Sequence, residues 1–564
     1  MRILLVASAF NSLSQRVFAE LRERGHSMRV QLGSGEDELR AAVDEHAPDL
    51  LLAPMLKSAI PRDVWSARTC LVVHPGPPGD RGPSALDWAM HEGADRWGVT
   101  VLQADEVMDG GPVWASAECP LPPAAKSDLY RNEVGDAALE AVLLAVERFA
   151  SGSHVPLPQG GPAWQAADHT RPYFDQGLRR IDWAADPTAA VLRSLRAADS
   201  QPGVLDGLLG GEWYLHGGHH EDELRGAPGE LLATRAGAVC RATVDGAVWI
   251  PELRARRRPG GPPTFKLPAA LALGDRLPRL PEVPAPLSPA PGRRTWTDLD
   301  YREEGPVGFL RFSFPGGAMS TSHCRRLLDA YRSACARPIS VLVLGGGRDF
   351  FSNGIHLNVI EAAADPGQES WENIQAMNDL VAAVLTTTDR LVVAALGGNA
   401  AAGGAMLALA ADEVWCRDGV LLNPHYRLMG LHGSEYWTYT LPRRAGGAAA
   451  RRLTGQALPV TARAARQLGL ADRVIPSAPQ EFGAEVGRLA ALLARSARLQ
   501  ERIAAKKATR ERDEALRPLA AYRAAELAEM HRTFFDPDAP YHALRSAFVR
   551  KRPAPSPPPV GGRW

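Results

Sequence analysis

Two groups of side chains in this sequence have types suited to acid–base chemistry. His74 and Asp109 form the first group, and Tyr426, Glu435 and Tyr439 form the second. An imidazole beside a carboxylate can donate to a developing oxyanion, because the carboxylate raises the pKa of the histidine. A carboxyl group or a phenol can carry a proton to or from a reacting atom. The sequence therefore predicts two catalytic sites in one chain.

Two glycine-rich loops each follow an apolar run that reads as a buried strand. Ile339–Leu344 precedes GGGRDFFSNGIHLN, and Leu391–Leu396 precedes GGNAAAGG. The second run continues to Asp412 almost without charge, as a membrane span would. Its glycines favour a different structure, a strand, a loop and a helix that begins near Gly403. Such a turn aims backbone N–H groups at one point and can stabilise an oxyanion.

The two loops together resemble the crotonase (enoyl-CoA hydratase/isomerase) superfamily over about residues 298–500. That family has an F-S-x-G-x-x-L segment after one strand and an A-x-G-G segment after the next, matched here by FSNGIHL and AAGG. The resemblance implies a coenzyme A (CoA) thioester as substrate. It also implies that the backbone N–H groups of Ile355 and Gly403 hold the thioester oxygen.

The two glutamates that hydratases of this family use are missing. The first position is Met406, and the second falls near His425 or Tyr426. Adding water across a double bond needs both carboxylates, so hydration is not expected. Tyr426, Glu435 and Tyr439 remain as candidates for proton transfer, although aromatic residues here could also simply pack a core.

The segments HPGPPGDRGPSALDWAM and GVTVLQADEVMDGGPVWAS resemble the folate-dependent formyltransferases, whose motifs are H-x-S-L-L-P-x-x-R-G and D-x-G. The resemblance makes His74 the catalytic histidine, Asp109 the catalytic aspartate and Arg81 the arginine of the R-G pair. The family usually has an asparagine two residues before the histidine, and this chain has Val72 there. The polar groups that we consider as substitutes are Asn11, Ser12 and Gln15.

The same resemblance places the pterin ring of 10-formyltetrahydrofolate against the backbone of PMLKSAIP, which contains Met55 and Lys57. Lys57 and Arg131 are candidates to meet the folate glutamate or a CoA phosphate. Each could equally be an ordinary solvated charge.

These groups must be positioned by strands and helices, whose pattern in the sequence predicts a multidomain α/β protein. Strands and helices alternate over residues 1–165, as in a doubly wound domain. Alternating strands around Asp245-Gly246, a hairpin turn signal, predict a small OB-like β-barrel at 166–277 that resembles the C-terminal domain of methionyl-tRNA formyltransferases. The remaining predicted parts are a proline-rich linker unable to join a core (278–297), the crotonase-like domain (298–500), C-terminal helices with an apolar stripe at Leu516, Leu519, Tyr522 and Leu527 (501–550), and a disordered tail (551–564).

Composition narrows the classes of function. Lys+Arg and Asp+Glu are both 64, so a nucleic-acid surface or a binder of anionic membranes is not expected. The 6 cysteines are scattered without a CxxC pair, which argues against a disulfide framework or a structural metal and favours the cytoplasm. The start, MRILLVASAF, reads as a first strand and not as a signal peptide.

The order of the two halves resembles the HypX (HoxX) family of hydrogenase maturation factors along nearly the whole chain. That resemblance implies synthesis of carbon monoxide for a [NiFe] centre from 10-formyltetrahydrofolate and CoA, with the hydrogenase large subunit or its maturation proteins as expected partners. One alternative is an amine formyltransferase fused to an acyl-CoA isomerase or hydrolase. Another is that the second half only binds CoA or acts as a scaffold.

Overall fold

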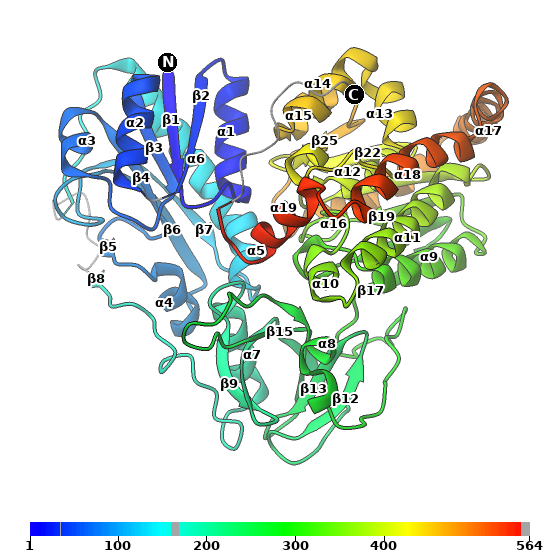
Figure 1. Ribbon diagram of the computed structural model, residues 1–564, viewed down its shortest axis with the longest axis horizontal. Coiled ribbons are helices and arrows are strands. Elements are labelled where there is room, and N and C mark those ends of the chain that lie inside the picture. Colours follow the sequence, from blue (N-terminus) through cyan, green and yellow to red (C-terminus); the bar gives the residue numbers. More distant parts are fainter. Residues whose placement is uncertain (34, 160–168, 554–564) are drawn as a thin grey trace. The chain divides into compact units, whose positions relative to one another are not determined.

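The computed structural model describes residues 1–33, 35–159 and 169–553, which divide into two compact units (Figure 1). Unit 1 contains Met1–Asp182 and Ala189–Asp206, and unit 2 contains Trp183–Thr188 and Gly207–Trp564. The predicted boundary at 165/166 and the predicted tail from residue 554 onward lie outside the described residues.

Unit 1 is built on a six-stranded sheet of order β2-β1-β3-β4-β6-β7. Strands β1, β2, β3 and β4 are parallel, and β6 and β7 continue the sheet in antiparallel fashion. The strands are β1 (Arg2–Ala7), β2 (Ser27–Leu32), β3 (Leu50–Met55), β4 (Cys70–His74), β6 (Arg96–Gln103) and β7 (Val113–Pro120), and β5 (Asp80–Arg81) pairs separately with β8 (His169–Thr170).

Helices cover both faces of this sheet, which confirms the predicted doubly wound domain. The side chains of Leu4, Val6 and Leu51 pack against α2 and α3 on one face. Helix α6 contacts β6 and β7 and packs against α1. The helices of the unit are α1 (Ser12–Glu23), α2 (Glu36–His46), α3 (Arg62–Ala67), α4 (Ala85–Glu92), α5 (Lys126–Arg131) and α6 (Glu133–Ser151), and α7 (Thr188–Ala198) lies almost wholly in it.

Short antiparallel strands form the β domain. Strands β12, β13, β14 and β11 form one sheet, in which Asp245-Gly246 lies between β13 and β14 as the turn signal predicts. Strand β15 lies between β10 and β16 in another. The bounds are β9 (Val204–Leu208), β10 (Gly211–His216), β11 (His219–Glu221), β12 (Leu231–Arg235), β13 (Ala238–Ala242), β14 (Ala247–Ile250), β15 (Glu252–Ala255), β16 (Leu267–Pro268), α8 (Ala269–Leu273) and η1 (Gly274–Arg276).

The proline-rich segment 278–297 is docked on this domain, which corrects the expectation that it joins no core. The N–H of Val283 donates to the carbonyl of Thr234 at 2.8 Å, and Trp296 is buried in the apolar cluster around Trp249. Arg293 pairs with Glu221 at 2.8 Å. Proline lacks a donor, but the residues between the prolines still supply donors and apolar side chains.

The crotonase-like part of unit 2 has a six-stranded sheet of order β17-β18-β19-β20-β22-β25. Only β17 and β18 pair in antiparallel fashion. A small sheet, β21-β23-β24, stands beside the loops that follow the central strands. The strands are β17 (Leu299–Glu304), β18 (Val307–Phe312), β19 (Val341–Gly345), β20 (Leu391–Leu396), β21 (Ala400–Ala401), β22 (Glu413–Arg417), β23 (Leu421–Asn423), β24 (Val460–Thr461) and β25 (Arg473–Ile475).

Alternate residues of the central strands serve two apolar clusters. Val343 and Val393 face a cluster that includes Phe482 of α16, and Leu344 and Ala394 face the larger cluster with α9 and α11, which lie side by side (Figure 1). The helices are η2 (Pro315–Gly317), α9 (Thr321–Cys335), α10 (Leu357–Ala362), α11 (Pro366–Thr386), α12 (Gly403–Leu409), η3 (Tyr426–Met429), α13 (Trp437–Ala445), α14 (Gly447–Gln456), α15 (Ala462–Gln467) and α16 (Phe482–Ala494).

The C-terminal helices are α17 (Leu499–Leu516), α18 (Leu519–Phe535) and α19 (Pro540–Val549). The predicted apolar stripe is correct for Leu519, which is buried, and for Tyr522 and Leu527, which pack against the larger cluster. It is wrong for Leu516, which is 86% exposed. Leu516 is the last residue of α17 and is followed by an extended residue, so it shares no helix face with the other three.

All six cysteines are unpaired, and only Cys335 is not fully buried. Burial raises the pKa of Cys70, Cys119, Cys240 and Cys416 to about 12. It raises the pKa of Cys324 and Cys335 as well.

Candidate active sites

His74 is the last residue of β4, at the carboxyl edge of the parallel part of the unit 1 sheet. Ligands of open α/β sheets bind at such edges. The imidazole is buried, and its Nδ1 lies 3.5 Å from Oδ2 of Asp109. The structure thus brings together the two residues that the sequence selected for formyl transfer.

Asp109 stands in the loop between β6 and β7, where its φ of 55° is left-handed. The loop is held in place from several sides. The N–H of Gly82 donates to Oδ2 of Asp109 at 3.3 Å, and Gln159 donates to the carbonyl oxygens of Asp109 and Gly111 at 2.8 Å each. A strained backbone that its surroundings hold in this way is a common feature of functional sites.

Asp80 is a member of this site that we did not select from the sequence. Its Oδ1 lies 2.9 Å from Nε2 of His74, and its side chain is buried. The imidazole is therefore held between two carboxylates, Asp80 and Asp109. The available signal was an acidic residue directly before the Arg81-Gly82 pair, in a loop otherwise made of glycine and proline.

Two of the three side chains that we considered as substitutes for the missing asparagine form hydrogen bonds at the start of α1. Asn11 caps α1 by accepting from the N–H of Ser14 at 3.0 Å, and Gln15 donates to the carbonyl of Phe10 at 2.8 Å. Ser12 is the first residue of α1. The polar side chain that the structure pairs with His74 in addition to Asp109 is Asp80.

The loops after β1 and β3 lie next to each other, because these strands are parallel neighbours. The N–H of Ser8 donates to the carbonyl of Met55, and the N–H of Lys57 donates to Oγ of Ser8, both at 2.9 Å. Arg81 lies on β5 and Arg131 is the last residue of α5. These elements all belong to unit 1, together with His74.

The two glycine-rich loops of unit 2 meet as predicted. Strand β20, a loop and α12 starting at Gly403 follow one another. Ser352 of the first loop forms a β-bridge with Ala400 of the second. A Cβ atom added to Gly354 would stand 3.1 Å from the backbone nitrogen of Gly403, so the peptide before Ile355 lies directly beside the start of α12. The first N–H groups of a helix have no partner within the helix and are available to an anionic oxygen.

Glu435 points at this junction. Its Oε1 stands where a Cβ atom on Gly403 would have to go. Its Oε2 accepts from the hydroxyl of Tyr426 at 2.8 Å and from the N–H of Ser434 at 3.0 Å. The N–H of Glu435 donates to Oδ1 of Asn378 at 3.0 Å, which helps to hold its left-handed φ of 58°.

Burial makes the carboxyl group of Glu435 a weaker acid than an ordinary glutamate. Glu435 is 1% exposed, and burial raises its pKa to about 7, with a further contribution from the nearby carboxylate of Glu526. Burial also raises the pKa of Tyr426 well above its ordinary value. A group that titrates near neutral pH can both accept and donate a proton in one reaction cycle.

Glu526 of α18 is a second residue that we did not select from the sequence. Its carboxylate accepts from the backbone N–H groups of Tyr436 and Thr438 at 2.9 Å each, at the start of α13. Burial raises its pKa to about 7. Its position four residues after Tyr522, on the apolar face of its helix, was the available signal for a buried acid.

Tyr439 does not join Glu435 and Tyr426. Its hydroxyl donates to Oδ2 of Asp513 at 2.8 Å and also contacts Arg510, both on α17. The position of the first missing glutamate, Met406, is fully buried in the apolar cluster.

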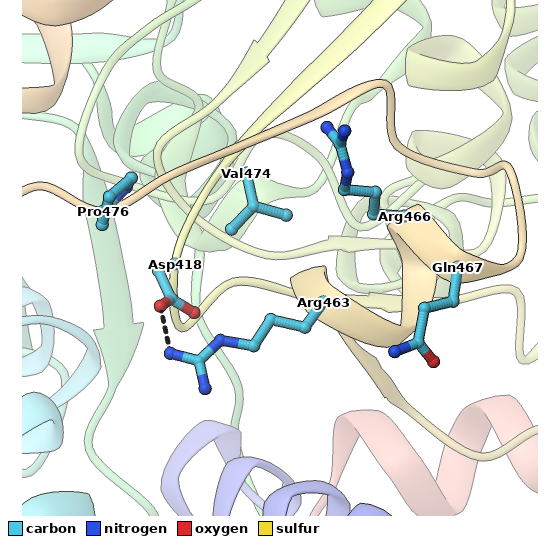
Figure 2. A pocket seen from close by; sticks show the side chains of 6 residues that line it. All are labelled: Asp418, Arg463, Arg466, Gln467, Val474 and Pro476. Carbon is cyan, nitrogen blue, oxygen red and sulfur yellow. Dashed lines mark hydrogen bonds and ion pairs between the residues drawn. The ribbon is translucent and has the colours of Figure 1, made fainter.

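A surface hollow elsewhere in unit 2 contains none of these residues (Figure 2). Its basic side chain Arg463 pairs with Asp418 at 2.5 Å, so the charge is compensated. The hollow is lined by Asp418, Arg463, Arg466, Gln467, Val474 and Pro476.

Among residues 1–33, 35–159 and 169–553, no cluster of histidine, cysteine or acidic side chains has the arrangement of a metal site. Within the same ranges, no helix combines the length and apolar character that a bilayer span requires.

Comparison with known families supports the family resemblance predicted for each half of the chain. Residues 2–146 match the formyl transferase family, residues 175–260 match the formyl transferase C-terminal domain, and residues 315–555 match the enoyl-CoA hydratase/isomerase family. The last match extends past the predicted end of the crotonase-like domain and takes in the C-terminal helices. Fold and sites therefore define a formyltransferase joined to a crotonase-like enzyme domain.

Full-length relatives narrow this class. The chain is 48% identical over 556 residues to the hydrogenase maturation factor HoxX of Bradyrhizobium diazoefficiens, covering 98% of this chain and 95% of the relative. The crystal structure of HypX from Aquifex aeolicus in complex with tetrahydrofolic acid superposes with a TM-score of 0.93 at 44% identity, covering 98% of this chain and 96% of that one. The chain belongs to the HypX/HoxX family of hydrogenase maturation factors.

Proposed function

We propose that this chain makes carbon monoxide for a [NiFe] centre in two steps, through formyl-CoA. The observation that carries the proposal is Glu435, a buried carboxyl with a pKa of about 7 beside the Gly403 end of α12. It supplies one proton-transfer group at a site that lacks both glutamates of the hydratases. Removing carbon monoxide from a formyl thioester needs one such group, whereas hydration needs two.

The first substrate is 10-formyltetrahydrofolate, bound by unit 1. The related HypX from Aquifex aeolicus was crystallised with tetrahydrofolic acid, and 44% identity over 98% of this chain supports a folate site here. We assign the pterin to the carboxyl edge of the sheet beside His74. The proposed binding residues are Asn11, Ser12, Gln15, Met55, Lys57, Arg81 and Arg131.

In the first step, the thiol of CoA attacks the formyl carbon. The new C–S bond forms, the bond from carbon to the folate nitrogen breaks, and the thiol proton passes to that nitrogen. His74 stabilises the oxyanion of the tetrahedral intermediate, and Asp109 at 3.5 Å stabilises the imidazolium and exchanges the proton.

In the second step, the N–H groups of Ile355 and Gly403 hold the oxygen of formyl-CoA. The carboxylate of Glu435 takes the proton from the formyl carbon, the C–S bond breaks, and the same proton goes to sulfur. The products are carbon monoxide and CoA, so atoms and electrons balance without an oxidant. The Tyr426 hydroxyl, 2.8 Å from Oε2, stabilises the carboxylate form before the first transfer and after the second.

The expected setting is the cytoplasm, and the expected acceptor of carbon monoxide is the hydrogenase large subunit or one of its maturation proteins. The family identity supports this assignment. Six unpaired cysteines are compatible with a reducing compartment.

The deciding experiment supplies the purified chain with 10-formyltetrahydrofolate and CoA and traps carbon monoxide with deoxymyoglobin. We expect carbon monoxide only when both compounds are present. Formate and tetrahydrofolate without carbon monoxide would refute the second step and leave the first. Formation of a formylated amine with no need for CoA would favour the amine formyltransferase alternative.

A further inference from the structure

Asp80 is a buried carboxylate whose role the two-step scheme leaves open. It is 3% exposed, and its backbone N–H donates to the carbonyl of Pro77 at 3.0 Å. Oδ1 lies 2.9 Å from Nε2 of His74, while Oδ2 is buried without a hydrogen-bond partner among the described residues. A buried ionised carboxylate is costly unless a cation compensates it, and His74 is the group in contact with it.

Gly76 shows how closely the backbone surrounds this pair. A Cβ atom at position 76 would stand 2.5 Å from Nε2 of His74 and 2.6 Å from Oδ1 of Asp80. Oγ1 of Thr100 donates to the carbonyl of Gly76 at 2.8 Å and fixes the loop in this position. The backbone thus covers the His74–Asp80 contact on one side, and any side chain at position 76 would disturb it.

The two carboxylates on His74 are not equivalent. The Asp80 side chain is 2% exposed and the Asp109 side chain 12%. The distance from Asp80 Oδ1 to Nε2 of His74 is 2.9 Å, shorter than the 3.5 Å from Asp109 Oδ2 to Nδ1. The inner nitrogen, Nε2, is therefore occupied by protein, and Nδ1 faces the more open side. A base that a third group orients through its second nitrogen is the general arrangement of catalytic triads.

We propose that Asp80 is a positioning residue of the formyl-transfer site. Its carboxylate accepts the Nε2–H of His74, which fixes the tautomer and leaves Nδ1 to work opposite Asp109. Asp80 takes no part in the proton transfers, so those of the first step are confined to Nδ1, Asp109 and the substrates. The inference rests on the proposed formyl transfer. It makes Asp80 the functional replacement for the asparagine that the formyltransferase family usually has at the position of Val72.

The first test is kinetic and uses Asp80→Asn, which keeps the size of the side chain and removes its charge. With 10-formyltetrahydrofolate and CoA, kcat for tetrahydrofolate formation should fall by roughly 10²-fold or more, because the tautomer and the imidazolium lose their support. KM for the folate should change less than threefold, since Asp80 acts on His74 and not on the pterin. An unchanged kcat, or a loss confined to KM, would overturn the proposal.

The second test determines the tautomer of His74 by NMR on the full chain labelled with ¹⁵N-histidine, with the resonances assigned from their loss in His74→Gln. The charged groups facing the imidazole are Asp80 of β5 and Asp109 of the β6–β7 loop, and the neighbouring Thr100 and Gly76 are neutral. The ¹⁵N shifts should place the proton of the neutral ring on Nε2 in wild type and in Asp109→Asn, and Asp80→Asn should lose this preference. A proton on Nδ1 in wild type, or the same tautomer in wild type and Asp80→Asn, would overturn the assignment.

These measurements separate failure of the inference from failure of the proposed function. If the wild-type chain transfers no formyl group to CoA, the proposed first step fails, while the NMR comparison still tests the pairing. If Asp80→Asn does not fold, Gly76→Ala tests the same contact without changing a charge. It should also lower kcat by at least tenfold, and a fully active Gly76→Ala variant would contradict the close packing on which the inference depends.

Discussion

Glu435 combines three properties that seldom meet in one residue. It is fully buried, it has a left-handed backbone, and its carboxyl group faces the end of a helix. Each property has a cost, because buried charges and left-handed φ values at non-glycine residues are unfavourable. Asn378, Ser434 and Tyr426 offset this cost through their hydrogen bonds.

Substituting Glu435 with glutamine should separate the two steps. A glutamine cannot accept the formyl proton, so carbon monoxide formation should fall by at least 10²-fold, while tetrahydrofolate formation should stay within threefold of wild type. Tyr439→Phe is the matched control, since its hydroxyl is bound to Asp513. Carbon monoxide release that depends on Tyr439 and not on Glu435 would assign the proton transfer to the tyrosine instead.

The same carboxyl group makes stability depend on pH. Its pKa is about 7 in the folded protein and ordinarily near 4.5, so the folded state holds the proton more tightly than the unfolded state does. Stability from this group is therefore fully present below about pH 4.5 and decreases as the pH rises to about 7. Above pH 7 it contributes no further change.

Glu435→Gln should remove the part of this dependence that Glu435 contributes and leave that of Glu526, whose pKa is also raised to about 7. Between pH 5 and pH 7, the unfolding transition of unit 2 should shift to lower temperature in wild type more than in the variant, as measured by calorimetry. The change over this pH range is on the order of 2 kcal/mol. The shift of Asp44→Asn, on the surface of α2, should match that of wild type, and equal shifts in wild type and Glu435→Gln would contradict the elevated pKa.

At the scale of elements, two helices contribute to the proposed second site. Helix α12 supplies its first N–H groups, and α18 supplies Glu526, which binds the backbone at the start of α13. The residues between them, Glu435 and Tyr436, both have left-handed φ values. A C-terminal helix thus helps to fix the backbone beside the proposed catalytic carboxyl of Glu435.

Replacing Glu526 with glutamine should therefore weaken both stability and activity. One carboxylate oxygen becomes an NH₂ group that faces an N–H donor, at a cost of about 2 kcal/mol. We expect a lower melting temperature for unit 2 and at least a tenfold loss of carbon monoxide formation. Glu529 on the same helix pairs with Arg532 at the surface, and Glu529→Gln should leave both quantities unchanged.

Gly403→Ala tests the start of α12. The new methyl group would occupy the position of Glu435 Oε1, so carbon monoxide formation should fall by 10²-fold or more. Gly455→Ala in α14 meets nothing within 4 Å and should be as active as wild type and slightly more stable. Full activity of Gly403→Ala would contradict the placement of the substrate at this helix end.

At the scale of the whole molecule, the two reactions proposed for this chain can be tested separately. His74→Ala should form no tetrahydrofolate but should still release carbon monoxide from formyl-CoA supplied directly. Glu435→Gln should show the reverse, forming tetrahydrofolate without releasing carbon monoxide from added formyl-CoA. A His74→Ala chain that fails to use formyl-CoA would show that the second step depends on the first site.

Much of this organisation could be predicted from sequence where the signal is local. The order of strand, glycine loop and helix at Leu391–Leu409 and the hairpin turn at Asp245 follow from residues close together in the chain. Asp80 and Glu526 could not be assigned in this way. Glu526 meets backbone N–H groups far from it in sequence, and the contact of Asp80 depends on how a proline-rich loop folds back on His74. Patterns of residue type do not encode such contacts.

The buried thiols have a consequence for a protein that handles an activated one-carbon unit. A formyl thioester exchanges readily with any nearby thiolate, so reactive cysteines would divert the product and leave the enzyme acylated on itself. With pKa values of about 12, four of the six cysteines are ionised to only roughly one part in 10⁴ at pH 8. These four thiols should thus be unreactive toward the proposed formyl thioester, and a thiol-specific dye added during turnover should count free CoA with little background from them.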